Sequence, residues 1–246
     1  LNIIILLNFT QKINNFIMRN LRKIFLFLSL GLFFVCGGKD NSVKFEEMSE
    51  SEKISYLNAK IRKEPNNAEL FFQRAETLFK KGELQDALLD IQKAVSIDKK
   101  QVEYHVLQAD ILFAQGETAL AFSSLQTAKE VDGKYIEAYL KSAELSLYLK
   151  DYEKTMFDVK QAILLDKLNP TAYFLRGWAL KEQGDTINAV KDYQKAIELK
   201  SDYEQAYEEL GILYAIKGDP LAVEYLNSTI NINPQNYSAM YVLALF

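Results

Sequence analysis

The sequence predicts an all-α protein, a solenoid in which antiparallel helix pairs stack along the chain. The first observation is a spacing of 34 residues, or twice that, between Gly82, Gly116, Gly184 and Gly218, with Lys150 in the slot that the period leaves open. The second is that each of these positions ends one amphipathic segment and precedes another, as glycine does where a helix stops. A fixed period of this length is typical of repeat proteins, whose repeats bury their apolar faces only by stacking.

Small residues recur on both flanks of each of these turns. In the first repeat Ala75 precedes Gly82, and Ala87 and Ala94 follow it. Small side chains at a crossing let two helices pack at the short end of the ~8–10 Å range of interaxial distances. The sequence therefore predicts half a repeat near 52–63, followed by five repeats at residues 68–101, 102–135, 136–169, 170–203 and 204–236.

The fourth repeat carries the clearest family resemblance. Its sequence "AYFLRGWALKEQGDTINAVKDYQKAIELKSD" is similar to the consensus of the tetratricopeptide repeat (TPR), and the resemblance covers about residues 68–246. Thr155 in the third repeat departs from the pattern, because the family usually has alanine there. The resemblance implies a right-handed superhelical solenoid with a concave groove that binds other proteins.

The sequence stops inside the first helix of a sixth repeat, 237–246, in which Ala239 corresponds to Ala206 of the fifth. Large apolar residues would be left uncovered there, namely Met240, Leu243, Leu245 and Phe246. We expect either that the sequence is truncated at this point or that a partner covers these residues.

Residues 18–35 are expected to be a signal peptide, because a basic stretch precedes an apolar run of about 12 residues, shorter than the ~20 of a membrane-spanning helix. The run ends in "LFFVC", which resembles the lipobox of bacterial lipoproteins, although Val35 stands where that family prefers a small residue. The resemblance implies that Cys36 is lipidated. The alternatives are an uncleaved anchor, or a secretory signal in which Cys36 has no role. Residues 1–17 are expected to be an upstream segment included by a misplaced start, with a second membrane-interacting segment as the alternative.

Residues 36–51 are polar and acidic, and they predict a tether between the lipidated Cys36 and the solenoid at 52–246. The lipobox resemblance implies a bacterial cell-envelope protein, held to the membrane by its lipid and facing the periplasm. The formal net charge of the chain is −4, with four basic and no acidic residues in 1–35. The remainder is thus acidic and would repel nucleic acid, which excludes nucleic acid as a partner.

The inventory of reactive side chains argues against an enzyme. The chain has one histidine, His105, at a first-helix position that other repeats fill with an aromatic residue such as Tyr139. A metal site needs convergent ligands, and neither these nor a P-loop or nucleophile motif is present in the sequence. We therefore expect no catalytic group, no metal, no cofactor and no small-molecule substrate.

The TPR resemblance implies that positions two, five, nine and twelve of each first helix line the groove. The predicted groove residues are Phe72, Glu76, Phe79, Val106, Asp110, Phe113, Leu140, Glu144, Phe174, Trp178 and Ile212. The apolar members predict a partner segment with apolar anchors, and the three carboxylates predict basic residues in that segment. The alternative is that Phe72, Val106 and Leu140 pack helix against helix, because groove and core positions adjoin.

Together these features predict a noncatalytic scaffold or adaptor at the bacterial cell envelope, which holds a protein or peptide segment in its groove. Two alternatives stay open. One is a self-associating structural lipoprotein, and the other is the TPR part of a longer enzyme or regulator truncated at its C-terminus.

Overall fold

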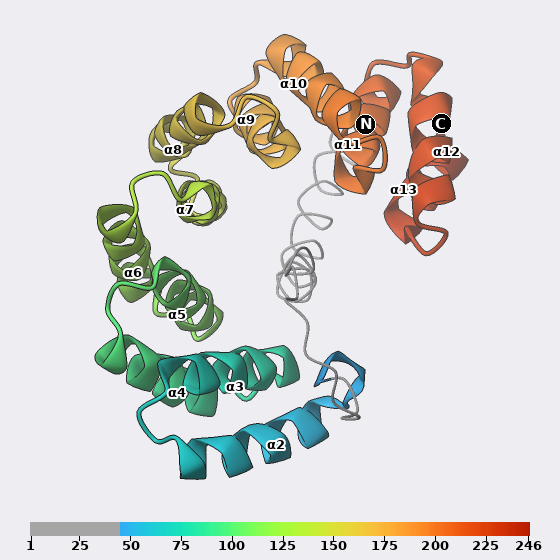
Figure 1. Cartoon of the computed structure of the whole chain (residues 1–246). Coiled ribbons are helices and arrows are strands. Elements are labelled where there is room, and N and C mark those ends of the chain that lie inside the picture. The colour runs from blue at the N-terminus through green and yellow to red at the C-terminus, as the bar shows by residue number, and fades with distance from the viewer. Residues whose placement is uncertain (1–44) are drawn as a thin grey trace. The chain divides into compact units, whose positions relative to one another are not determined.

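The computed structural model describes residues 45–246, and within that range the protein is all-helical without a β-strand (Figure 1). A 3-10 helix, η1 (Phe45–Glu47), precedes twelve α-helices in this part of the chain. The α-helices are α2 (Glu50–Lys63), α3 (Ala68–Lys81), α4 (Leu84–Ile97), α5 (Val102–Ala114), α6 (Thr118–Val131), α7 (Ile136–Tyr148), α8 (Tyr152–Leu165), α9 (Pro170–Glu182), α10 (Thr186–Leu199), α11 (Glu204–Ile216), α12 (Leu221–Ile232) and α13 (Tyr237–Leu245). The all-α prediction is confirmed, and each of the five full repeats contains two of these helices.

The described residues form two compact units. An N-terminal unit comprises residues 45–99 and 110–118, and a C-terminal unit comprises residues 100–109 and 119–246. Helix α5 therefore contributes its first part to the C-terminal unit and its last part to the N-terminal unit. The third, fourth and fifth repeats lie entirely in the C-terminal unit.

Helix α2 begins inside the segment 36–51 that the sequence predicts to be a tether. Ser49 and Glu52 form a capping box, in which the N–H of Ser49 donates to the Glu52 carboxylate at 2.8 Å and the N–H of Glu52 donates to Ser49 Oγ at 3.4 Å. Because this box satisfies free N–H groups at the helix start, the helix extends to Glu50, and η1 lies just before it.

Three predictions fall on residues that the structure does not describe: the upstream segment 1–17, the signal peptide 18–35 and the lipidation of Cys36. They stay predictions. Among residues 45–246, no helix has both the length and the apolar composition needed to span a bilayer.

Each helix pair turns at the residue that the 34-residue period singles out. The backbone angle φ is positive at all five positions, Gly82 (81°), Gly116 (89°), Lys150 (61°), Gly184 (86°) and Gly218 (68°). At the third of these turns the N–H of Lys150 donates to the carbonyl of Leu147, and the N–H of Asp151 donates to that of Ser146. This is the hydrogen-bond pattern of a Schellman helix end, which favours glycine at the left-handed position. Lys150 adopts that conformation without being glycine.

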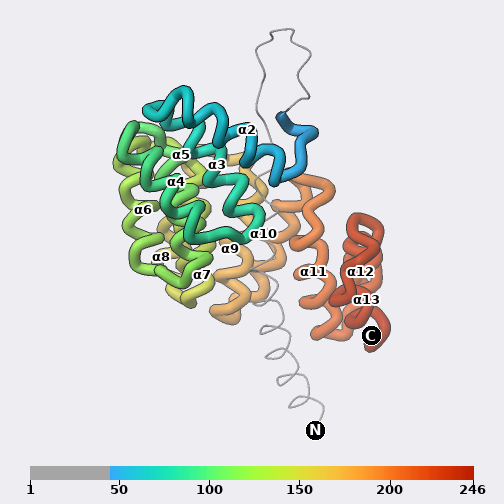
Figure 2. The backbone as a smooth tube through the Cα atoms, turned by 90° about the horizontal axis from the view of Figure 1, so that it is seen from below, coloured from blue at the N-terminus to red at the C-terminus, as the bar shows by residue number. Residues whose placement is uncertain are grey.

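In the C-terminal unit the helices of the third to fifth repeats alternate between two layers (Figures 1 and 2). We call α7, α9 and α11 the first-helix layer, and α8, α10 and α12 the second-helix layer. Helix α9 contacts α8 and α10, and α11 contacts α10 and α12. Within the first-helix layer, α7 also contacts α9.

Small residues lie where the two helices of a repeat cross, as the sequence predicts. Gly177 and Gly211 are buried, and a Cβ atom at Gly177 would lie 2.9 Å from the ring of Tyr193. A Cβ atom at Gly211 would lie 2.7 Å from Leu226. Because glycine has no Cβ atom, the large residues of the second helix fit against these two positions. Both Tyr193 and Leu226 are fully buried.

A polar contact joins the two helices of four repeats at a spacing of 16 residues. The pairs are Arg74–Asp90, Gln108–Ser124, Ser142–Asp158 and Arg176–Asp192. The fifth repeat is one residue shorter between its helices, and there Leu210, which is fully buried, and Tyr225, which is partly buried, stand at the two equivalent places. The position of this contact therefore recurs in four repeats, while the residue types that form it differ from repeat to repeat.

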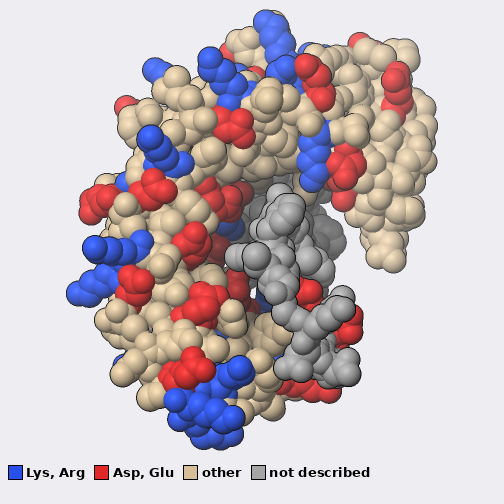
Figure 3. All heavy atoms as spheres, viewed as in Figure 1, with Lys and Arg blue, Asp and Glu red and all other residues tan. Residues whose placement is uncertain are grey.

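The last helix, α13, contacts α11 and α12 and buries Ala239. Of the residues expected to be uncovered there, Met240, Leu245 and Phe246 are exposed, whereas Leu243 is partly buried. The helix contains no charged residue, and the surface over this end of the chain is almost free of charged side chains in Figure 3.

Candidate functional site

The fifth-position residues of the predicted groove belong to the protein interior. Phe72, Val106, Leu140 and Phe174 are only 5–8% exposed. Phe174 lies between two tyrosine rings of the C-terminal unit, with centroid distances of 5.6 Å to Tyr193 and 5.2 Å to Tyr203. The burial of Phe72, Val106 and Leu140 agrees with the alternative interpretation of the sequence, and Phe174, which was expected in the groove, is buried as well.

The ninth-position residues remain partly accessible to solvent. They are Glu76 and Asp110 in the N-terminal unit, and Glu144, Trp178 and Ile212 in the C-terminal unit. Of the twelfth-position residues, Phe79 and Phe113 are partly accessible too. Fewer of the predicted groove residues are therefore accessible than the sequence alone indicates. In the C-terminal unit the accessible ones are the ninth-position residues of α7, α9 and α11.

Trp178 on α9 is the largest of these accessible side chains. Its ring lies 6.0 Å from that of Phe174, centroid to centroid, and Lys181 Nζ lies 5.8 Å from the Trp178 ring. Phe174 packs against the indole from the interior, and the Lys181 ammonium makes a cation–π contact with the indole. A half-buried tryptophan held in this way is a favourable contact point for an apolar group of another molecule.

Lys181 connects the fourth and fifth repeats beside Trp178. Its Nζ lies 2.8 Å from the Glu209 carboxylate on α11 and 3.7 Å from that of Glu182. Burial lowers the pKa of Lys181, but the attraction of Glu209, and then of Glu182, outweighs burial, so that the pKa is raised. The lysine is therefore charged at neutral pH, and it fixes the spacing of α9 and α11 next to the indole.

The Tyr193 hydroxyl of α10 lies close to the same carboxylates. Burial raises the pKa of Tyr193 well above its usual value, and the charges of Glu209 and Glu182 raise it further. This hydroxyl is buried and has no hydrogen-bond partner within residues 45–246. The phenol is thus neutral, and its ring fills the space above Gly177.

Two of the three predicted groove carboxylates, Glu76 and Glu144, differ in their surroundings. Burial raises the pKa of Glu76, the nearby Lys80 lowers it, and Glu69 raises it. Glu76 forms no ion pair in the described part of the chain. Glu144 instead lies 3.9 Å from the ammonium of Lys141 on the same helix. A cation from a partner would therefore gain more at Glu76 than at Glu144, because the partly desolvated carboxylate of Glu76 has Lys80 nearby but forms no direct ion pair with it.

Glu208, at the fifth position of the last full repeat, is hydrogen-bonded to the turn before the last helix. Its carboxylate accepts a hydrogen bond from Asn236 Nδ2 at 3.0 Å, and that of Glu204 accepts from Asn233 and Asn236 at 2.7 and 2.8 Å. Burial raises the pKa of Glu208, while the nearby Ser238 hydroxyl and the hydrogen bond from Asn236 lower it. These carboxylates connect α11 to the turn before α13.

Sequence reasoning missed the polar contacts between the paired helices. The 16-residue spacing of Arg74 and Asp90 recurs with identical residue types in Arg176 and Asp192, so the signal was present in the repeat alignment. His105 is buried, as expected for a residue in place of an aromatic side chain. Among the described residues, no group of three or more His, Cys, Asp or Glu side chains is placed to hold a metal ion.

Two segments of the chain match family profiles of the tetratricopeptide repeat. The family profile described as "Tetratricopeptide repeat" matches residues 68–101, and the profile "TPR repeat" matches residues 177–218. BBSome complex member BBS4 of Bos taurus is 30% identical over 95 residues, which are 38% of this chain. The match spans 18% of the length of BBS4.

Two solved structures illustrate the likeness in fold. The APC/C hetero-tetramer Cut9–Hcn1 has a TM-score of 0.69 at 16% identity, over 80% of this chain and 39% of that chain. YrrB, described as a TPR protein with an unusual peptide-binding site, has a TM-score of 0.54 at 18% identity, over 76% of this chain and 97% of that chain. At these identities the likeness establishes the fold, and with the matched repeats it shows that the chain contains tetratricopeptide repeats in an all-α solenoid.

Proposed function

We propose that the protein is a noncatalytic scaffold that holds a segment of a partner protein on the first-helix layer. The observation that carries this proposal is the accessibility of one position on three successive first helices, Glu144 on α7, Trp178 on α9 and Ile212 on α11. A row of accessible side chains at a constant repeat position suits an extended or helical segment better than a compact small molecule.

The chemistry of these positions defines the partner segment. An apolar side chain placed against Trp178 and Ile212 would contribute roughly 1.5–3 kcal/mol if fully buried. In the N-terminal unit, a lysine or arginine of the partner would form the direct ion pair that Glu76 does not form within the described residues. The peptide-binding site named for YrrB supports a peptide ligand, because that protein shares the fold. This role requires neither a metal nor a catalytic group.

The test compares Trp178→Ala with Ile187→Ala, in the full chain, as baits for capture from detergent-solubilised membranes. Ile187 is a matched control because it lies in the same repeat, on α10 of the other layer, and is 68% exposed. We expect Trp178→Ala to lose the captured protein by tenfold or more, since a hot-spot residue contributes about 2 kcal/mol. Phe174→Ala is unsuitable, because it would open the interior.

Equal capture by both variants would overturn the proposal. A partner that resists Trp178→Ala but is lost with Glu76→Gln would instead move the binding surface to the N-terminal unit. Circular dichroism of each bait confirms that loss of capture does not reflect unfolding.

We also propose that the scaffold is lipid-anchored at a bacterial envelope, facing the periplasm. The support is the signal-like segment 18–35 and the "LFFVC" sequence that ends at Cys36. In cells fed a labelled fatty acid, the wild-type chain should incorporate label, and Cys36→Ala should abolish both labelling and membrane retention. Unchanged labelling in Cys36→Ala would contradict the proposed anchor.

A further inference from the structure

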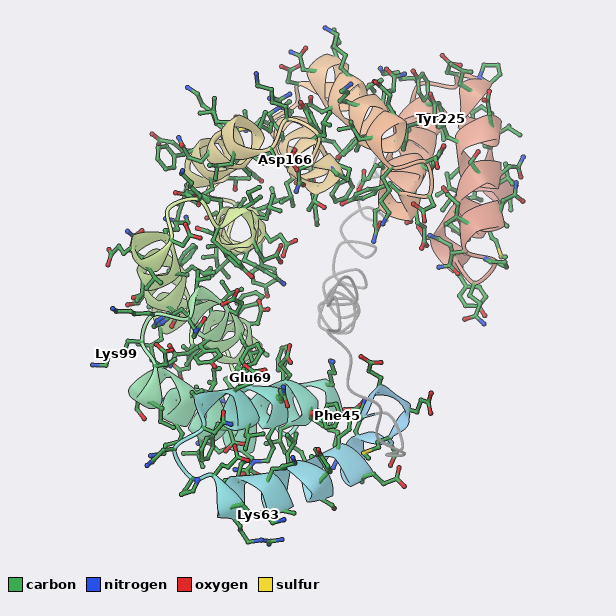
Figure 4. All side chains as sticks on the ribbon, viewed as in Figure 1. Phe45, Lys63, Glu69, Lys99, Asp166 and Tyr225 are labelled. Atoms are coloured by element: carbon green, nitrogen blue, oxygen red, sulfur yellow. The ribbon has the colours of Figure 1, made fainter. Side chains whose placement is uncertain are left out.

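An ion pair crosses the first-helix layer between two accessible apolar side chains, Trp178 and Ile212. Lys181 lies about one turn after Trp178 on α9, and Glu209 lies about one turn before Ile212 on α11. Lys181 Nζ and the Glu209 carboxylate are 2.8 Å apart, so that side chains of α9 and α11 reach toward each other (Figure 4). The two charged side chains are 22% and 18% exposed. A segment that covers both Trp178 and Ile212 therefore passes over this ion pair.

The ion pair retains hydrogen-bonding groups that no residue in 45–246 uses. The ammonium of Lys181 has three N–H donors, and one of them bonds to Glu209 Oε2. The Glu182 carboxylate lies 3.7 Å from Lys181 Nζ, which is beyond the usual length of a hydrogen bond. The second oxygen of Glu209 accepts no hydrogen bond from the described residues. A bound molecule thus finds a donor and an acceptor next to each other at this place.

The repeat framework does not require this ion pair. Leu147 precedes Leu175 by 28 residues, as Lys181 precedes Glu209, and the two leucines stand at the equivalent places between the third and fourth repeats. Both leucines are buried. An apolar contact therefore serves the fold there, and replacing an ion pair by apolar residues is often neutral or stabilising. The charged pair between the fourth and fifth repeats indicates a role beyond stability.

An extended chain can supply the matching groups from its backbone, whereas a helix cannot. In a helix the backbone N–H and C=O groups bond to one another. A helix lying over Lys181 and Glu209 would therefore dehydrate them without replacing the hydrogen bonds to water. In an extended segment the backbone groups are free, and main-chain hydrogen bonds hold such segments on proteins. A helical partner would need an Asn or Gln side chain at this place instead.

We propose that the partner segment binds to the first-helix layer as an extended chain, and that Lys181 and Glu209 bind its backbone between two apolar side chains. This inference rests on the proposed function and adds the conformation of the bound segment. Lys181 donates to a backbone carbonyl, and Glu209 accepts a backbone N–H. One apolar side chain of the segment lies against Trp178, and the other lies against Ile212. The ion pair itself stays formed, so that neither charge is buried alone.

The first test determines the conformation of bound peptides. Random peptides without tryptophan, displayed on phage, are selected on the purified full chain in detergent solution, and those that Trp178→Ala no longer retains are synthesised. Trp178 is the single tryptophan of the chain, so its fluorescence reports binding. Each interior residue of the tightest peptide is then replaced by proline. We expect affinity to change less than about threefold at most positions, because proline suits an extended chain but breaks a helix.

The second test examines the role of the ion pair. Where proline is not tolerated, an ester in place of the amide removes the N–H donor and should weaken binding to the wild-type chain about tenfold. Lys181→Leu with Glu209→Leu copies the leucine pair of the preceding repeat junction, and this variant should bind the amide and ester peptides equally. The matched control is Lys195→Leu with Glu198→Leu, which removes a 2.7 Å ion pair on α10 of the other layer and should keep the preference for the amide.

Loss of binding on proline replacement throughout the peptide would show a helical ligand and overturn the proposal. Tolerance of proline at every position would overturn it too, because Glu209 would then bind no N–H. So would an unchanged preference for the amide in Lys181→Leu with Glu209→Leu, once circular dichroism shows that this variant is folded. A selection that yields no peptide dependent on Trp178 would instead contradict the proposed binding surface itself, so the two failures are distinguishable.

Discussion

The third and fourth repeats have the same helical framework but neutralise a buried carboxylate differently. In the fourth repeat, Nε and Nη2 of Arg176 donate to the two oxygens of Asp192, each at 2.7 Å, within one repeat. In the third repeat, Ser142 stands at the position of Arg176 and donates to Asp158. The Ser142 hydroxyl is neutral, and the counter-charge of Asp158 comes from outside the repeat.

Lys129 supplies that charge from α6 of the second repeat, where its Nζ lies 2.6 Å from the Asp158 carboxylate. Asp158 is 1% exposed, and burying a carboxylate without a counter-charge is energetically costly. The residues at the position of Lys129 in the neighbouring repeats are apolar, Val95 and Ile163. A repeat can thus be stabilised by its own arginine or by a lysine of the preceding repeat, and the second arrangement couples adjacent repeats.

Lys129→Met should produce the largest loss of stability. It leaves Asp158 buried without a counter-charge, which costs about 3–5 kcal/mol. Arg176→Met breaks the corresponding contact in the fourth repeat, but the Asp192 side chain that it leaves behind is 10% exposed, compared with 1% for Asp158. We therefore expect a smaller loss, about 1–3 kcal/mol. Urea unfolding of both variants, followed by far-ultraviolet circular dichroism, measures the difference.

A double variant checks the cause of this effect. Ser142→Arg with Lys129→Ile gives the third repeat the arrangement of the fourth, with the counter-charge inside the repeat. It should recover most of the stability that Lys129→Met loses. The account of coupled repeats would fail if Lys129→Met were no more destabilising than Arg176→Met.

The two repeats also differ where their helices cross. The third repeat pairs Ala143 with Val159, whereas the fourth pairs Gly177 with Tyr193. The larger second-helix residue thus faces the smaller first-helix residue. The summed size of the two side chains decides whether the helices can approach, because the interior is closely packed.

Gly177→Ala should destabilise the protein by about 1–2 kcal/mol. The added Cβ atom would lie 2.9 Å from the Tyr193 ring and 3.2 Å from the carbonyl oxygen of Ala189, and overpacking outweighs the gain in helix propensity. Tyr193→Val makes room for the new methyl group. In a double-mutant cycle, we expect the combined change to cost less than the sum of the single changes by about 0.5–3 kcal/mol. Additive losses would exclude the predicted clash.

The repeat period was sufficient to predict the helix pairs, their turns and the small residues at their crossings. It was not sufficient to separate Phe174 from Trp178. Residues four apart lie on the same face of a helix, so the pattern cannot show which of them neighbouring helices cover. It also missed the contact of Lys129 with Asp158. This contact joins residues of two repeats, and Lys129 stands at a position that is apolar in the neighbouring repeats. Contacts that depart from the repeat consensus need the structure.

Lys150→Gly should stabilise the protein by about 0.5–1 kcal/mol. Lys150 has a φ of 61° at the turn where the fourth repeat has Gly184. A residue with a Cβ atom pays about 1–2 kcal/mol in this left-handed conformation, and the greater freedom of glycine in the unfolded chain offsets part of the gain. The urea midpoint should rise with an unchanged m-value. Gly184→Lys, the reverse change in the fourth repeat, should lower it by a similar amount.

Thr155→Ala should have the smallest effect, a change of less than about 1 kcal/mol. Thr155 is fully buried on α8, where the fourth repeat has Ala189, and its Oγ1 donates to the carbonyl of Asp151 at 2.9 Å. That carbonyl also accepts the N–H of Thr155 at 3.0 Å, so removal of the hydroxyl leaves no backbone group without a partner. The greater helix propensity of alanine offsets part of the lost packing. A loss above about 2 kcal/mol, comparable with that of the neighbouring core change Val159→Ala, would show that the third repeat depends on this hydroxyl as well as on Lys129.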